Sequence, residues 1–255
     1  MLYGLEDKIK EFKKIIAENN LRQSYLFFGE PGIGKFTFAC CLVNFLESGE
    51  FAPASRPLID SEIFQPNKSG SLGIDSVRRL KNFLYQRPLI SSRRSAIFDS
   101  AETLTSEAQN ALLKIIEEPP AFSLTIFISR EPAIFPPTLI SRFTKVYFPR
   151  LNEELIAKFL KEKFKIEANR ALKIAQQSFG RIGRAIQLLE PEKNLFLTES
   201  DNLDSFLENE ILALRKNLLK NSSKLAWFLE REELIKRYNL NPKLQLKAIQ
   251  EKINE

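Results

Sequence analysis

Two patterns of apolar residues alternate along the chain as far as Pro149. Short continuous runs, too short and too aromatic for good helices, predict buried strands. Between them apolar residues recur every three or four positions, which predicts amphipathic helices. We expect strands at residues 25–28, 61–65, 95–98, 124–129 and 145–149, helices at 5–17, after 34, at 74–84 and at 106–118, and a loop at 47–56. This alternation predicts a parallel α/β sheet with ligands at the carboxyl ends of its strands.

Beyond Pro149 the pattern is helical throughout, so this proline marks a natural domain boundary. We expect helices at residues 151–164, 169–190, 208–221, 223–239 and 241–255, the second of them broken at Gly180 and Gly183. The single tryptophan, Trp227, falls on an apolar helical stripe, which indicates a core position. The length and pattern therefore predict two or three units.

The segment from Tyr25 to Cys41 joins the first predicted strand to a helix through a glycine-rich turn. It contains Gly29, Ile33, Gly34 and Lys35 at the spacing G-x-x-x-x-G-K, with Gly32 between them. Glycines let backbone N–H groups close around phosphate oxygens, the lysine reaches the outer phosphates, and the helix directs its positive dipole end at them. A phosphate-binding loop is predicted, and a mere tight turn with an exposed lysine is the weaker alternative.

One position of this loop departs from the pattern. The residue after the lysine ordinarily carries a hydroxyl for Mg²⁺, and here it is Phe36. Thr37 lies one residue further on, about 100° around the helix, and is a poor substitute. Productive nucleotide binding and a retained, inactive loop both remain open on these residues.

Asp99 follows the third apolar run directly, where a carboxylate that holds Mg²⁺ is expected at the end of a strand. The next position often carries a glutamate that polarises water, but here it is Ser100. Glu102 stands two residues later and is expected to project elsewhere. Ser129 ends the fourth run and is expected beside the phosphates. The alternative for Asp99 is a cap on a helix over 103–116.

Charge and composition narrow the classes of function. The net charge of +6 permits contact with nucleic acid or an acidic partner and proves neither. A basic surface on the 74–84 helix is either a solvated face or a face that tracks DNA phosphates; its residues are Arg78, Arg79, Lys81 and Arg87. No apolar run reaches the ~20 residues that span a bilayer, so we expect no membrane association.

Histidine is absent, and the two cysteines, Cys40 and Cys41, are adjacent. Such a chain lacks the usual general base and cannot supply four zinc ligands of the ordinary kinds. We therefore expect no zinc site, and two unpaired cysteines fit the reducing cytoplasm.

Several segments together resemble the AAA+ clamp-loader family, and within it most closely the delta-prime subunits of bacterial DNA polymerase III. They are GEPGIGK at 29–35, LGIDSVRRL at 72–80, NALLKIIEEPP at 110–120, PPTLISRF at 136–143, FGRIGRAIQLL at 179–189 and NLNPKLQLKAI at 239–249. The resemblance covers nearly the whole chain, and the segment at 110–120 is its most specific part. It implies three units: a P-loop AAA+ sheet domain at 1–149, a small helical lid at 150–191 and an all-α collar at 192–255 that mediates oligomerisation.

The departures from the family pattern also carry information. Phe36 and Ser100 replace the metal-binding hydroxyl and the Walker B glutamate, and Gly183 stands where the family places its sensor 2 arginine, with Arg184 one step late. Many relatives carry a four-cysteine zinc module between the P-loop helix and the second strand, and this chain lacks those cysteines. Arg142, in contrast, stands at the position of the family's arginine finger, although a surface salt bridge is the alternative role for it.

The resemblance implies a subunit that binds ATP or ADP, if at all, without efficient hydrolysis, and that supplies Arg142 in trans. Its implied partners are gamma/tau- and delta-type subunits in a heteropentameric ring, a sliding clamp and primed DNA. An ATP-hydrolysing gamma/tau-type motor, with Thr37 serving the metal, is the first rival. An interaction module outside replication is the second.

Overall fold

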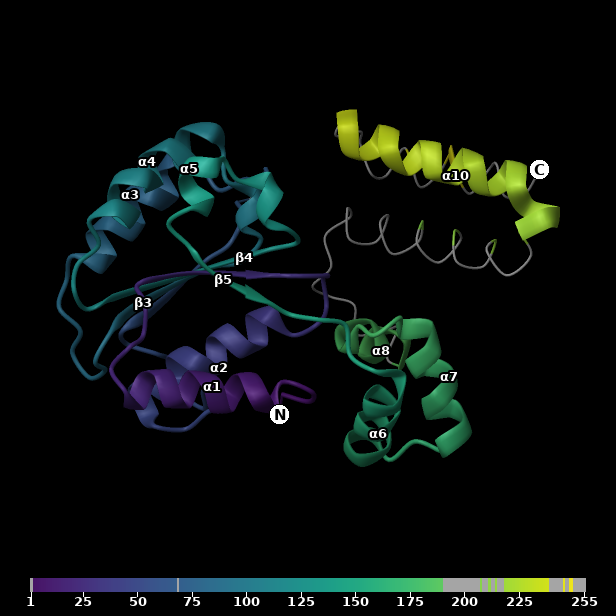
Figure 1. Cartoon of the computed structure of the whole chain (residues 1–255), viewed down its shortest axis with the longest axis horizontal. Helices are drawn as coiled ribbons and strands as arrows, with labels where there is room; N and C mark the ends of the chain where they lie inside the picture. The colour runs from purple at the N-terminus through teal and green to yellow at the C-terminus, as the bar shows by residue number, and fades with distance from the viewer. Residues whose placement is uncertain are drawn as a thin grey trace. The chain divides into compact units, whose positions relative to one another are not determined.

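The computed structural model describes residues 2–67, 69–189, 207, 211, 214, 218–238, 245, 248 and 249. The chain falls into two compact units, Met1–Leu189 and Glu190–Glu255. The first holds the sheet and eight of the labelled α-helices, and the second holds α10 (Figure 1). Each unit is described separately below. The predicted division of the first unit at Pro149 stays a prediction.

The first unit is built on a five-stranded parallel sheet in the order β2-β3-β4-β1-β5. The strands are β1 (Ser24–Phe28), β2 (Ser61–Phe64), β3 (Arg94–Phe98), β4 (Ser123–Ser129) and β5 (Thr144–Tyr147). All five predicted strands are therefore confirmed, each within two residues at its ends. The P-loop strand β1 lies between β4 and β5, so that Phe28 is opposite both Ser129 and Tyr147. The fold is that of an AAA+ domain.

Successive residues of the central strands face opposite layers, as the two-residue period of a strand requires. Leu26, Phe98 and Phe127 pack with α3 (Ile74–Leu84), α4 (Ser106–Glu117) and α5 (Pro137–Ile140). Phe27 and Ile126 pack with α1 (Glu6–Ala17) and α2 (Lys35–Ser48). The two sets of helices cover opposite faces of the sheet (Figure 1). Because α2 continues to Ser48, the predicted loop at 47–56 begins two residues too early.

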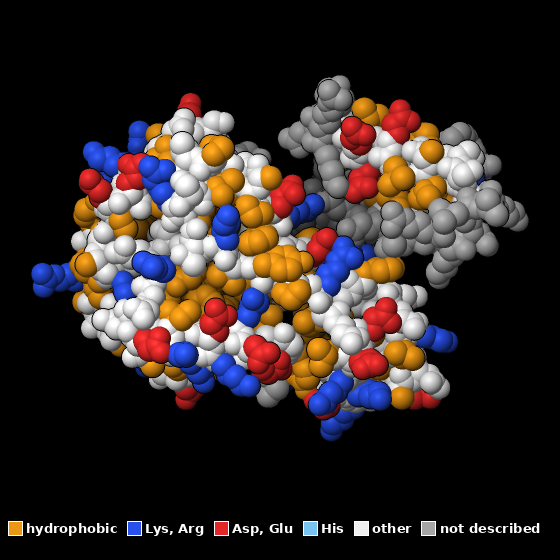
Figure 2. Space-filling view, in the orientation of Figure 1, with side chains coloured by type: hydrophobic (Ala, Val, Ile, Leu, Met, Phe, Trp, Pro, Cys, Tyr) orange, Lys and Arg blue, Asp and Glu red, His pale blue; other side chains and the backbone are white. Residues whose placement is uncertain are grey.

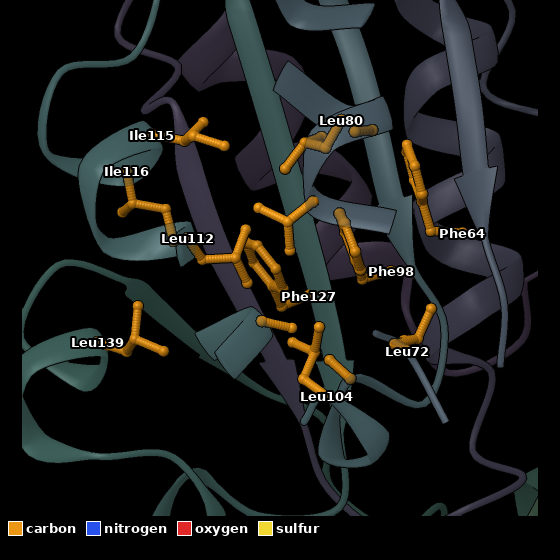
Figure 3. Packing of buried hydrophobic residues seen from close by; sticks show 14 of the residues in the cluster. Phe64, Leu72, Leu80, Phe98, Leu104, Leu112, Ile115, Ile116, Phe127 and Leu139 are labelled. Carbon is orange, nitrogen blue, oxygen red and sulfur yellow. The ribbon is translucent and has the colours of Figure 1, made fainter. Parts of the chain in front are cut away.

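A column of phenylalanine rings runs through the layer beneath α3 and α4 (Figure 3). Phe64 stacks on Phe98 with ring centroids 4.6 Å apart, and Phe98 stacks on Phe127 at 4.9 Å. Phe143, three residues beyond the end of α5, continues the column as a tilted ring with its centroid 4.9 Å from that of Phe127. Offset ring pairs of this kind add stabilisation beyond the burial of their area. The column ties three strands to the segment that carries Arg142.

A buried ion pair between Asp60 and Arg94 lies at the amino-terminal ends of β2 and β3. The Asp60 carboxylate, fully buried before β2, accepts a 2.8 Å hydrogen bond from Arg94 Nη1. It also accepts hydrogen bonds of 2.7–2.8 Å from the backbone amides of Leu89, Ile90 and Ser91. Every lone-pair direction of this buried carboxylate therefore has a donor, which is the condition for tolerating a buried charge.

Three helices, α6 (Glu153–Phe164), α7 (Ala168–Ser178) and α8 (Ile182–Leu189), follow the sheet. They form their own apolar cluster, in which Ile156, Leu160 and Ala185 are buried. Gly180, with φ of +79°, lies between α7 and α8 and confirms the predicted break there. The predicted break at Gly183 is wrong, because this residue lies in the first turn of α8.

In the second unit, α10 runs without interruption from Leu218 to Tyr238. The predicted end of one helix at 221 and start of the next at 223 are therefore wrong. Straight-chain and apolar residues on both sides of Ser222 and Ser223 sustain the helix there. Trp227 packs edge-on against Phe228, with ring centroids 5.2 Å apart, in an apolar cluster. Most of the predicted helices at 208–221 and 241–255 lies outside the described residues.

Figure 2 shows lysines and arginines interspersed with acidic side chains over the face in view, without a large patch of one sign. In the part of the chain that the structure describes, no helix combines the length and apolarity that crossing a membrane requires.

Candidate nucleotide-binding site

The glycine-rich loop leaves the carboxyl end of β1 and leads into α2. Gly29 has φ of +139°, and a Cβ on it would lie 2.4 Å from the carbonyl oxygen of Phe148. Its amide donates a 3.0 Å hydrogen bond to the carbonyl of Arg130, which follows β4. Only glycine fits both the conformation and the space. Ile33 is buried inside the loop, and Gly34 caps α2 in a left-handed conformation.

Lys35 lies inside the loop with 7% of its surface exposed. Its ammonium group donates hydrogen bonds to the carbonyl oxygens of Gly29 and, at 2.8 Å, of Glu30. Burial lowers the pKa of Lys35 to about 8, and the nearby Glu102 carboxylate opposes that shift. A buried cation whose donors point to loop carbonyls is poised to exchange them for a stronger anionic partner, such as a phosphate.

The two residues after Lys35 occupy different environments. Phe36 is half-buried and packs against the apolar cluster of α1 and α2, which accounts for a phenylalanine at this position. Thr37 is exposed. The site thus lacks a hydroxyl at position 36, and the threonine faces solvent as the helical geometry predicts.

Asp99 follows β3, as predicted, and its charge acts on Lys35. Ser100 adopts a left-handed conformation with φ of +56° and turns the chain into a short 3-10 helix, Ala101–Thr103. This turn overturns one expectation. Glu102 does not project elsewhere: its carboxylate is the largest of the charges that raise the pKa of Lys35. The pKa of Glu102 is itself raised, mainly by burial, and its Oε2 has no hydrogen-bond partner among the described residues.

The alternative for Asp99, a cap on a helix over 103–116, is wrong. That helix, α4, begins at Ser106, and the Thr105 hydroxyl caps it by accepting a 3.2 Å hydrogen bond from the Ala108 amide. Ser129 ends β4 beside β1 and is buried, and its hydroxyl donates a 3.1 Å hydrogen bond to the carbonyl of Glu131.

Helix α8 contacts the glycine-rich loop directly; the helices α6 to α8, which correspond to the lid implied by the resemblance, are called the lid helices below. The Gly183 amide donates a 2.7 Å hydrogen bond to the Gly32 carbonyl oxygen, and a Cβ on Gly183 would lie 2.9 Å from that oxygen. Arg184 is buried, with its guanidinium 5.2 Å from the centre of the Phe179 ring. Gly183, which the resemblance aligns with the sensor 2 arginine, thus makes a backbone contact with the loop.

A second contact joins the loop to the segment before the lid. Arg150 donates a 2.7 Å hydrogen bond to the Glu30 carboxylate. Burial alone would raise the pKa of Glu30, but the positive charge of Arg150, with smaller effects of Arg181 and Lys35, lowers it below its ordinary value. The Gly32 and Glu30 contacts hold the loop from one side.

Arg142 is exposed and lies two residues beyond the end of α5, on a surface segment, Ser141–Arg142, that is called the rim below. Its guanidinium donates hydrogen bonds to the Thr138 carbonyl oxygen and to the Glu117 carboxylate at the end of α4. Both roles considered for it, finger and salt bridge, are compatible with this position. Of the basic residues expected on the 74–84 helix, Arg78 pairs with Asp75 at 3.1 Å and Arg79 pairs with Glu62. The assignment of Arg87 to this surface is wrong, because α3 ends at Leu84.

The residues of this site fit a phosphate group better than a metal. The loop and its buried lysine supply cationic and amide donors, whereas the metal-binding hydroxyl is missing at Phe36. Within the described residues, no group of three or more acidic, cysteine or histidine side chains is placed to hold a metal ion. Cys41 is buried and Cys40 half-buried, and burial raises the pKa of the Cys40 thiol to about 11, so the protonated thiol prevails.

Sequence reasoning missed three parts of the site. These are the Gly183–Gly32 contact, the charge of Glu102 near Lys35, and the pairing of Glu117 with Arg142. The first two depend on long-range packing and on a left-handed turn at Ser100, neither of which leaves a periodic signal. The third could have been suspected from the acidic pair Glu117–Glu118, which precedes the two prolines of the segment 110–120.

Comparison with known proteins identifies relatives of this chain. The family model "DNA polymerase III, delta subunit" matches residues 4–152. The gamma/tau subunit of DNA polymerase III from Mycoplasma genitalium is 30% identical over 75% of this chain and 35% of its own length. The tau subunit from Bacillus subtilis is 26% identical over 73% of this chain and 36% of its own length. The chain thus spans about a third of these curated relatives.

Solved structures share the fold at lower identity. A DNA polymerase III gamma subunit-related protein from Thermotoga maritima aligns with a TM-score of 0.55 and 22% identity, over 94% of this chain and 96% of its own. The RuvB branch-migration motor from the same organism aligns with a TM-score of 0.54 and 14% identity, over 97% and 82%. Because the family match covers more than half of the sequence, this chain belongs to the DNA polymerase III delta subunit family and carries a delta/delta-prime-like clamp-loader domain.

Proposed function

We propose that this chain is a delta-prime-like clamp-loader subunit that hydrolyses little or no ATP and supplies Arg142 to a neighbouring subunit. It acts as a stator in a heteropentameric ring with gamma/tau- and delta-type subunits. The ring opens a sliding clamp and loads it on primed DNA. The observation that supports the proposal is the hydrogen bond from the Gly183 amide to the Gly32 carbonyl oxygen: the residue that the resemblance aligns with the sensor 2 arginine is a glycine in backbone contact with the loop.

Phosphoryl transfer requires a metal, a positioned water and cationic groups in register. Here the position after Lys35 offers no oxygen ligand, Ser100 offers no carboxylate, and Gly183 offers no charge. Each loss alone would slow hydrolysis, and together they remove three separate sources of transition-state stabilisation. A bound ATP or ADP would place its phosphates against Lys35 and the loop amides, and these donors would neutralise the negative charge of the phosphates.

Arg142 keeps a charged group that suits a phosphate, whereas the chain's own site lacks three of the groups that hydrolysis needs. An arginine is always charged, and its planar fork of donors matches phosphate oxygens. Its side chain is 34% exposed, on a rim where a neighbouring subunit could reach it. The Pro136–Pro137 pair restricts the backbone that leads into α5, so the position of this rim is well defined.

A gamma/tau-type motor is the second candidate. Two observations favour it: the curated relatives named above are gamma/tau and tau subunits, and the Glu102 carboxylate acts on Lys35. In this reading Glu102 would orient water in place of the glutamate that Ser100 replaces. The missing ligand at Phe36 and the Gly183 contact argue against it.

The test is to purify the complex that forms around this chain in its source cell and to rebuild it with wild-type, Arg142→Ala and Arg170→Ala subunits. Arg170 is an exposed arginine of α7 and serves as the matched control. We expect all three complexes to assemble, and only Arg142→Ala to lower DNA-stimulated ATPase and clamp loading. The loss in the whole ring will be smaller than the about 10³–10⁵-fold of a single finger, because other interfaces keep their own.

Equal ATPase and equal loading in the three complexes would remove Arg142 from the mechanism. Separately, the isolated chain should show ATP turnover at background level. Turnover comparable to that of a motor subunit would instead establish the second candidate.

A further inference from the structure

The guanidinium of Arg142 is held by two groups of its own chain. One terminal nitrogen donates to the Glu117 carboxylate and the other to the main-chain oxygen of Thr138. These contacts use two of the five N–H donors of an arginine. The side chain nevertheless remains 34% exposed, and that of Glu117 46% exposed. The two contacts therefore orient the guanidinium without removing it from the surface.

The backbones on both sides of this pair are fixed by the core. Glu117 directly follows Ile115 and Ile116, whose side chains are 5% and 6% exposed. Arg142 directly precedes Phe143, which is buried and packs in a tilted arrangement against Phe127. Since both Cα positions are set, the remaining freedom of Arg142 lies in its side-chain torsions. The contacts to Glu117 and Thr138 restrict those torsions.

We infer that Glu117 is a positioning residue for Arg142: it holds the guanidinium on the rim in the orientation from which it can engage an anionic group of a neighbouring subunit. The inference rests on the proposed role of Arg142 in trans. An unrestrained arginine side chain loses its rotamer freedom when it binds, and that loss opposes binding. A side chain already ordered within its own subunit avoids most of that loss.

Glu117 offers a clean test, because it is followed by a second exposed glutamate at the end of the same helix. Among the described residues, the carboxylate partner of Arg142 is Glu117 and not Glu118. Glu118 lies at the C-cap of α4, so Glu118→Ala controls for charge and helix-end effects. The pair is exposed, so we expect its loss to leave stability and assembly nearly unchanged. A fall in activity would then reflect orientation of the arginine.

The measurement is the kcat and the KM for ATP of the rebuilt complex with Glu117→Ala, Glu117→Gln and Glu118→Ala subunits. We expect Glu117→Ala to lower kcat by about two- to tenfold with little change in KM. Glu117→Gln, which keeps a neutral acceptor oxygen, should recover most of the loss, and Glu118→Ala should match wild type. In an Arg142→Ala background, Glu117→Ala should have no further effect.

The outcomes separate the two proposals. If Arg142→Ala lowers kcat and Glu117→Ala does not, the positioning role is wrong and the proposed function stands. If Arg142→Ala has no effect, both are wrong. An additional loss from Glu117→Ala in the Arg142→Ala background, or failure of Glu117→Ala alone to assemble, would give Glu117 a role independent of Arg142 and overturn the inference.

Discussion

The amide of Gly183 donates a hydrogen bond of 2.7 Å to the carbonyl oxygen of Gly32, so the first turn of α8 contacts the phosphate-binding loop through the backbone. The contact requires glycine on the lid side. A Cβ on Gly183 would lie 2.9 Å from the Gly32 oxygen and 3.0 Å from its Cα. Lid and loop are thereby joined within the first unit.

This contact predicts an unusual response to alanine. In a helix, alanine is ordinarily more stable than glycine by about 1 kcal/mol. We expect Gly183→Ala to lower the free energy of unfolding instead, by about 1–3 kcal/mol, because the methyl group overpacks the Gly32 backbone. Urea unfolding measures the change. Gly73→Ala is the control, since a Cβ there has nothing within 4 Å; stabilisation by Gly183→Ala would contradict the contact.

Lys35 predicts a specific dependence of stability on pH. Its pKa in the folded chain is about 8, below the ordinary 10.5, so between these values the unfolded chain holds a proton that the folded chain does not. The contribution of Lys35 to the free energy of unfolding is therefore fully present above 10.5, falls as the pH falls, and is lost below about 8. The slope is at most about 1.4 kcal/mol per pH unit.

The measurement compares wild type with Lys35→Met by urea unfolding between pH 7 and pH 10. The free energy of wild type minus that of the variant should rise over this range, since methionine carries no titrating group. A constant difference would show that Lys35 titrates in the folded chain as it does in water.

Asp60 predicts a dependence of the free energy of unfolding on pH in the acidic range. Burial alone would raise its pKa, but the amides of Ser91, Ile90 and Leu89, with Arg94, lower it below the ordinary 3.8. Its contribution to stability is therefore present above that value and is lost as the pH falls through the lower, folded value. At pH 7 Asp60→Ala should cost about 3–5 kcal/mol, because it leaves the Arg94 charge buried without its partner.

The control for this prediction is Asp75→Ala, which removes an exposed ion pair with Arg78 and should have little effect. The gap between wild type and Asp60→Ala should narrow below pH 4. A gap that is small at pH 7, or that does not depend on pH, would be evidence against the role given to the Asp60 carboxylate.

Restoring the missing catalytic groups should not create an ATPase. We expect the double variant Phe36→Thr, Ser100→Glu to turn over ATP at the background level of wild type. The variant still has a glycine at 183, where the resemblance places the sensor 2 arginine, and Phe36 is lost from the apolar cluster against which it packs. A coupled assay for released phosphate measures this. Sustained turnover by the variant would show that the lid contact does not limit hydrolysis.

The sheet could be predicted because each of its strands is a short apolar run that a single local pattern identifies. The strands around Leu26, Ile97 and Ile126 are buried on both faces, as continuous apolar runs imply. Helix interruptions were less accessible. Glycine weakens helices, which predicts a break at Gly183, yet here this glycine allows close packing between α8 and the loop.

The loop, Lys35 and Asp99 followed from spacing, because a phosphate site needs glycines and a lysine at fixed separations. The environment of Glu102 did not follow. The left-handed Ser100, with φ of +56°, redirects the chain after β3, and no local signal in a serine indicates that conformation. The partner of Arg142 depends on the packing of α5 against α4, which the sequence pattern does not specify.

The ring column that ends at Phe143 has a consequence for how this sequence can vary. The family resemblance places a cysteine at position 143, whereas here a phenylalanine closes the row begun by Phe64, Phe98 and Phe127. The substitution Phe143→Cys alone would leave a cavity the size of a ring beside Phe127. This cavity would adjoin Arg142, the residue that precedes position 143. We therefore expect the side-chain sizes at positions 127 and 143 to covary among homologous sequences, with a larger residue at one position where the other is smaller.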